Sequence, residues 1–233
     1  GRQIHRSSHA LVDDLSDIKT DANSAADLFE DLKDEDCTVF AHIGGRYADI
    51  KMAHDERLEK AVEVHSAWGT FEWLIEDAFE QGYRVGIVSN SDGHKGRPGA
   101  SHPGATKFGA YGGLTCNLAP SFSRAGLMEA MKRRHHYGTT GCRMVLDTRA
   151  EFDNPAELFS DDPNLGDVTS RIASSAMMGD ILRSSDGEVI FKIDVHASAP
   201  IERIDIRNGL ETVEVFRPYA KADLGRRIRV LWE

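Results

Sequence analysis

The sequence predicts an α/β protein in which a parallel sheet precedes a small antiparallel β unit. From about residue 20 to residue 147, short apolar runs alternate with amphipathic helical stretches, which is typical of a parallel α/β layer. From residue 179 onward apolar and polar residues alternate, and an Asp-Gly and an Asn-Gly pair mark turns. We therefore divide the 233 residues into three parts. These are an α/β part (1–147), an acidic connecting segment (148–178) and a β-sandwich-like C-terminal domain (179–233).

Apolar spacing defines the elements of the α/β part. In residues 70–83, apolar side chains recur at helical intervals, which is typical of an amphipathic helix. Residues 21–33 show the same spacing behind Asp and Asn capping candidates, and a third helix begins after Ser121 or Ser123 and runs to about His135. The predicted strands, short apolar runs between these helices, are residues 37–42, 61–66, 84–90 and 112–119.

After residue 147 the character of the sequence changes. Residues 151–167 are acidic and contain proline, and we expect them to form a loop-like connection. Segments that alternate apolar and polar residues then follow one another, which predicts antiparallel strands. The predicted strands are residues 188–197, 201–209, 211–217 and 226–232.

Composition excludes several classes of function. The formal net charge of −10 argues against a nucleic-acid partner, because phosphate backbones require clustered Lys and Arg. No apolar run approaches the roughly 20 residues of a membrane span. The three cysteines are far apart and form no CxxC pair, which indicates reduced thiols in a cytoplasm-like compartment. The nucleotide-binding and serine-hydrolase signatures GxxxxGK[ST], GxGxxG after a strand and GxSxG are absent.

Possible metal ligands stand at the ends of three predicted strands. The first strand ends at His42, the second at His65, and the third leads to Asp92 and His94. Carboxyl ends of parallel strands meet at one edge of a sheet, so we expect these side chains to converge. Carboxylate oxygen and imidazole nitrogen suit zinc, manganese or iron. Taken singly, Asp92-Gly93 is also a common turn pair, and each histidine could be structural.

The remaining histidines are expected to have no role in a metal site. We expect His54 to be solvated in a polar stretch, and His135 and His136 to lie at a solvated helix end beside basic residues. His196, on a strand of the C-terminal part, is expected to be structural.

Several of these motifs resemble the PHP superfamily, the polymerase and histidinol phosphatase group of metal-dependent phosphoesterases. "FAHIGGRY" (40–47) is similar to its "AHPGRY"-type segment, and "VSNSDGH" (88–94) to its "GGSDFH"-type motif. "AVEVHSAWG" (61–69) stands where the family has an intervening strand. "GLMEAMKRRHHYGTTG" (126–141) resembles a PHP-related branch with a β-rich C-terminal extension. The resemblance covers about residues 37–147.

The resemblance implies both a fold and a set of site residues. It implies the later half of a distorted (β/α)7 TIM-like barrel, because the family's opening HxH strand has no match here. We therefore expect the chain to start inside the domain, so that a missing N-terminal part or another chain completes the site. Carried over residue by residue, the metal ligands are His42, Asp92 and His94, with His65 at a plausible position. Arg46 falls where the family binds the substrate phosphate, and we expect Glu63 to point away from His65 on the alternating strand.

The function that follows is a metal-dependent hydrolase, a phosphoesterase of the PHP type, with a small phosphorylated substrate and no membrane or nucleic-acid partner. Divalent zinc, manganese or iron would lower the pKa of a bound water to about 7 and polarise the phosphoryl oxygen. Asp92 would both bind metal and steer the proton, and Arg46 would hold the phosphate. The alternative is a non-catalytic binding or structural module with a degenerate metal site.

Overall fold

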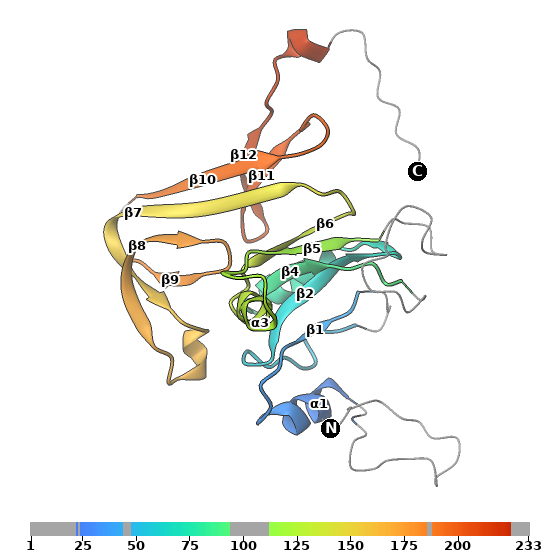
Figure 1. The fold of residues 1–233 in the computed structure, drawn as a ribbon, viewed down its shortest axis with the longest axis vertical. Coiled ribbons are helices and arrows are strands. Elements are labelled where there is room, and N and C mark those ends of the chain that lie inside the picture. The colour runs from blue at the N-terminus through green and yellow to red at the C-terminus, as the bar shows by residue number, and fades with distance from the viewer. Residues whose placement is uncertain (1–21, 23, 44–47, 94–111, 186–187, 225–233) are drawn as a thin grey trace.

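The computed structural model describes residues 22, 24–43, 48–93, 112–185 and 188–224 (Figure 1). About 40% of the described residues lie in strands, which form several small sheets, and 17% lie in helices. The prediction of an α/β fold, the later half of a TIM-like barrel, was therefore wrong. Within the described ranges, none of the helices combines the length and the apolar character needed to cross a membrane.

One sheet is built around a central strand. Strand β2 (Glu59–Ser66) pairs in parallel with β1 (Val39–Ala41) and with β4 (Gly86–Ser89), and antiparallel with the short β3 (Gly69–Thr70). The prediction that the strands before His42, His65 and Asp92 lie side by side in parallel is thus confirmed. All eight residues of β2 are buried, as expected of a central parallel strand covered on both faces.

Three α-helices accompany this sheet in the described part of the chain. Helix α2 (Trp73–Glu80) packs Leu74 and Ala78 against Val62 of β2. Helix α1 (Ala25–Leu32) begins at Ser24, whose hydroxyl accepts from the Asp27 N–H in a capping box. Helix α3 (Arg124–Lys132) begins at Ser123, one of the two predicted caps. Each helix is shorter than its predicted span.

The fourth predicted strand does not extend the parallel sheet. Strand β5 (Leu114–Asn117) pairs antiparallel with β6 (His136–Thr139), a strand that the sequence analysis did not predict. The segment "HYGT" contains one aromatic residue and no aliphatic run, so apolar spacing gave no signal for it. This antiparallel pair replaces the strand–helix repeat that a barrel requires.

A long strand organises the second half of the molecule. Strand β7 (Val145–Phe159) pairs antiparallel with β8 (Ser170–Met177) along one edge and with β10 (Val189–His196) and β9 (Ile181–Arg183) along the other. The prediction that residues 151–159 belong to a loop was wrong. The β7–β8 register breaks between Glu151 and Ala156, which accommodates Pro155, because proline cannot donate to a regular ladder. Phe152, Ala156 and Leu158 build a separate small core there.

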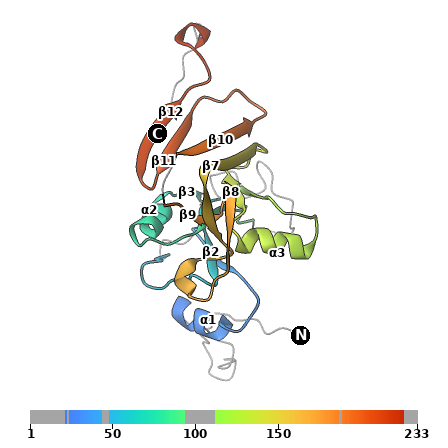
Figure 2. The ribbon, with the colours of Figure 1, turned by 90° about the vertical axis from the view of Figure 1, so that its left-hand side faces the viewer.

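The described chain ends in a hairpin and a short helical turn. Strands β11 (Ile204–Asn208) and β12 (Glu211–Phe216) pair antiparallel through the predicted Asn-Gly turn, with Gly209 at φ +58°. The hairpin lies toward the end of the molecule opposite α1 (Figures 1 and 2). Antiparallel pairing after residue 179 is confirmed. The β-sandwich-like domain stays a prediction, and its last predicted strand, 226–232, lies outside the described residues.

Candidate functional site

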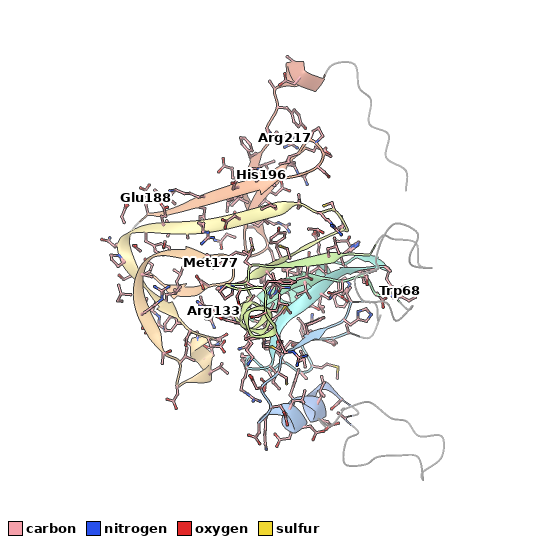
Figure 3. All side chains as sticks on the ribbon, viewed as in Figure 1. Trp68, Arg133, Met177, Glu188, His196 and Arg217 are labelled. Carbon is pink, nitrogen blue, oxygen red and sulfur yellow. The ribbon has the colours of Figure 1, made fainter. Side chains whose placement is uncertain are left out.

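Two of the predicted ligands meet at the carboxyl edge of the parallel sheet. His42 directly follows β1, and Asp92 follows β4 by three residues. The His42 Nε2 and Asp92 Oδ2 atoms lie 3.8 Å apart. Trp68, just past the end of β2, is half exposed beside this edge (Figure 3). The structure therefore brings the His42 and Asp92 side chains close together.

Glu63 connects these two predicted ligands to the sheet, a role that the sequence analysis did not assign to it. Its Oε2 atom hydrogen-bonds to His42 Nδ1 and accepts from the Ile43 N–H at 3.0 Å. Its Oε1 atom accepts from the Asn90 side-chain amide at 2.7 Å. The side chain is 2% exposed, and three hydrogen bonds compensate the cost of burying a carboxylate. A charged residue inside the apolar run "AVEV" was the signal that could have identified it.

The contacts of His42 determine which ring nitrogen is available for a ligand. Nδ1 lies against a carboxylate that can only accept, which assigns the proton of a neutral ring to Nδ1. The Nε2 lone pair then faces the Asp92 carboxylate at 3.8 Å, beyond hydrogen-bonding distance. Two electron-rich atoms so placed repel one another unless a proton or a cation lies between them.

A divalent metal fits this pair of atoms. Ligand atoms bonded at about 2.0–2.2 Å around a tetrahedral ion lie roughly 3.3–3.6 Å from one another, close to the observed separation. A carboxylate on the far ring nitrogen is also the usual support of a metal-bound histidine. The His42 side chain is 50% exposed, so a ligand can reach it from solvent.

The loop after β4 holds Asp92 in an uncommon backbone conformation. Asp92 has φ +47°, a left-handed value that Asp tolerates better than most residues. Such conformations cost roughly 1–3 kcal/mol and persist where neighbours over-determine them. Here the Asn90 N–H donates to the His65 carbonyl at 3.0 Å, and the Asn90 carbonyl accepts from the Gly113 N–H at 2.8 Å. The loop is therefore tied to two separate segments.

His65 is buried at the same end of β2 but has a different environment. Its Nδ1 atom hydrogen-bonds with Thr70 Oγ1 at 2.6 Å across the β2–β3 turn. Gly113 packs so closely that an added Cβ would lie 2.9 Å from His65 Cδ2 and 2.7 Å from Ser89 Cβ. His65 thus forms its hydrogen bond with Thr70 beside the chain Glu63–His42–Asp92.

The other two predicted site residues, His94 and Arg46, lie outside the described residues. In the part of the chain that the structure describes, no group of three or more His, Cys, Asp or Glu side chains is placed to hold a metal ion. Among the described residues, the predicted site therefore consists of His42 and Asp92, with Glu63 against the far ring nitrogen of His42.

Buried polar groups that sequence reasoning did not find lie near this site and beyond it. The side chain of His54, expected to be solvated, is only 4% exposed. Its Nδ1 atom forms a hydrogen bond with Glu59 Oε2 at 2.7 Å, and its ring stacks on the Tyr83 ring with 3.8 Å between the centroids. His135 and His136, expected at a solvated helix end, are also buried. Burial lowers the pKa of His136 to about 4, so its ring is neutral at pH 7.

Comparison with known proteins places the chain in a family. No curated protein and no solved structure matches it. The family model described as "Protein of unknown function (DUF3604)" matches residues 89–214, from the last residue of β4 through most of β12. The match includes Asp92 and its loop and covers more than half of the 233 residues. The chain belongs to the DUF3604 family.

Proposed function

We propose that the chain carries the divalent-metal site of a hydrolase that acts on phosphoesters, of the PHP type that its motifs resemble. One observation carries the proposal: His42 Nε2 faces Asp92 Oδ2 at 3.8 Å while Glu63 holds the opposite ring nitrogen. A divalent zinc, manganese or iron ion bound there would supply an acidified water and polarise a phosphoryl oxygen.

The residues of the chain have separate roles in this proposal. Glu63 fixes the tautomer and orientation of His42, and Asn90 and the Ile43 N–H in turn fix Glu63. His42 and Asp92 would hold the ion, and the Asp92 carboxylate would accept a proton from the attacking water. The resemblance adds His94 as a third ligand and Arg46 as the group that binds the substrate phosphate.

The competing proposal is a non-catalytic binding or structural module with a degenerate metal site. Among the described residues the site offers two metal ligands, and a catalytic zinc has three protein ligands. The two proposals differ in phosphoester hydrolysis.

Metal content and hydrolysis, measured on the same samples, test the proposal. The chain would be titrated with manganese and with zinc by calorimetry, and p-nitrophenyl phosphate would be the substrate. His42→Ala should lose metal binding and hydrolysis together, and Glu63→Gln should weaken metal affinity by about 10–100-fold. His196→Ala, which changes a largely exposed histidine of β10, is the matched control and should change neither.

The outcomes separate the two functions. Metal binding that depends on His42 without hydrolysis would favour the non-catalytic module. Metal binding that is unchanged by His42→Ala would show that the metal does not bind at His42, and would overturn the proposed site.

A further inference from the structure

A cavity of about 750 Å³ lies between α1 and β1, and His42 forms part of its wall. Three segments provide its apolar surface: α1, β1 and the loop that follows residue 47. Among the described residues, this surface includes Leu28, Phe29, Val39, Ala41, Ile50 and Met52. The cavity thus shares one side chain with the candidate metal site.

The chemistry of the wall limits what can bind there. The described lining residues include no Lys or Arg, so the described part of the wall offers no counter-charge to an anion. The described acidic residues of the wall are Asp49 and Glu59, and the Glu59 Oε2 atom already forms a hydrogen bond with His54 Nδ1 at 2.7 Å. Sugar hydroxyls against aliphatic side chains would lose hydrogen bonds to water without replacement. A volume of this size accommodates an organic group of drug-like dimensions.

The mouth of the cavity exposes apolar side chains to water. Met52 is 84% exposed and Phe40 is 39% exposed, and both belong to the lining. An apolar ligand would cover this surface, and a flexible thioether adapts readily to different ligand shapes.

We propose that the substrate is a phosphomonoester of an apolar alcohol, aromatic or medium-chain aliphatic, whose organic group occupies this cavity. The inference rests on the proposed function, because it places the phosphoryl group at His42. Hydrolysis breaks the bond between phosphorus and the alcohol oxygen and forms one between phosphorus and the water oxygen. A proton of the water passes to the departing alcohol, so the products are the free alcohol and phosphate.

Two independent measurements test the inference. The first is binding of 2-naphthol, a product-like alcohol, followed by calorimetry in the presence of a chelator so that no metal is needed. The second is kcat/KM for 1-naphthyl phosphate and for phenyl phosphate, whose leaving groups are of similar acidity, with added manganese or zinc. We expect 2-naphthol to bind, and naphthyl phosphate to be preferred by at least about tenfold, the effect of burying a few apolar atoms.

Two variants locate the binding. Ala26→Trp fills the cavity from an exposed position of α1, and Met52→Glu places a carboxylate at its mouth without disturbing the core. Both should weaken 2-naphthol binding and lower the naphthyl preference by about tenfold, while metal content stays at the wild-type value. The matched control is Phe122→Glu, which changes a fully exposed apolar residue outside this cavity and should leave both measurements unchanged.

The failures of the two proposals are distinguishable. Naphthol binding that Ala26→Trp removes, in a chain that binds no metal, would overturn the proposed function and keep the cavity as an apolar binding site. Metal-dependent hydrolysis with no naphthyl preference and no naphthol binding would overturn the inference and keep the function.

Discussion

The central strand β2 and the C-terminal strand β12 use polar residues in opposite ways. Every residue of β2 is buried, including Glu63 and His65, whereas every residue of β12 is exposed. Buried polar groups are stable only when partners satisfy them, so β2 constrains the position of each partner. Exposed polar groups remain hydrated, so they do not fix the positions of neighbouring side chains. Function in this molecule is therefore expected where polar side chains are buried, at the carboxyl edge of the parallel sheet.

The largest expected effect comes from removing a buried carboxylate. Glu63→Ala leaves the His42 Nδ1, the Ile43 N–H and the Asn90 amide without their acceptor, which should lower the free energy of unfolding by about 3–5 kcal/mol. Glu214→Ala, on the exposed β12, should change it by at most about 0.5 kcal/mol. Urea unfolding of the two variants measures both. Equal losses would show that burial does not distinguish the strands.

Acid should destabilise the molecule through a buried histidine. His136 is 3% exposed, and burial lowers its pKa from 6.5 to about 4. The unfolded chain therefore binds this proton first, and stability present above pH 6.5 is lost as pH falls toward 4. The loss approaches about 3 kcal/mol, at 1.36 kcal/mol for each unit of pKa difference.

The comparison of variants isolates this effect from that of the carboxylates. The free energy of unfolding of His136→Gln should change less between pH 6.5 and 4 than that of the wild type. His196→Gln removes the largely exposed histidine of β10 and should follow the wild-type curve. Parallel curves for the wild type and His136→Gln would contradict the prediction.

A smaller effect is expected at the start of α3. The Ser123 hydroxyl accepts from the Gly126 N–H at 3.0 Å, so Ser123→Ala removes one cap and should cost about 1 kcal/mol. Ser123→Asn, which retains an acceptor, is the matched control and should cost much less. Thermal unfolding of both variants is the measurement. A full loss in the Asn variant would show that the cap is not the cause.

The sequence allowed local elements to be predicted better than their assembly. The strands before His42, His65 and Asp92 were found by their apolar runs, and their parallel pairing was predicted from the helices that alternate with them. The α/β assignment was wrong because β6 lacks an aliphatic run and because Pro155 interrupts the apolar pattern of β7. The barrel that the resemblance implied was wrong with it. Both features depend on tertiary pairing, which local spacing does not encode.

The same limit applies to the candidate site. His42 and Asp92 were identified because each follows an apolar run, whereas Glu63 stands inside one. Residues 63 and 65 are two positions apart, but the β2–β4 register shifts between them, so the alternation of a regular strand does not decide whether their side chains share a face. What mattered was the partner of each side chain, which only the folded chain defines.

Two lysine–carboxylate pairs of nearly equal length give the most direct comparison of the two regions. Lys60 Nζ and Asp161 Oδ1 lie 2.6 Å apart, and Lys192 Nζ and Glu151 Oε1 lie 2.7 Å apart. The Lys60 side chain is 3% exposed, and its pKa is lowered because burial outweighs the attraction of Asp161. The Lys192 side chain is 61% exposed. Distance alone would predict equal strength, and burial predicts otherwise.

Double-mutant cycles on both pairs decide between distance and burial. The Lys60→Met and Asp161→Ala cycle should give a coupling energy above about 1.5 kcal/mol, because each single change leaves a partly desolvated charge without its partner. The Lys192→Met and Glu151→Ala cycle should give about 0.5 kcal/mol or less, since solvent screens both groups. Raising the salt concentration should reduce the second coupling and leave most of the first. Equal couplings would mean that the Lys60 pair is solvated in solution, and that the burial of β2 does not govern its electrostatics.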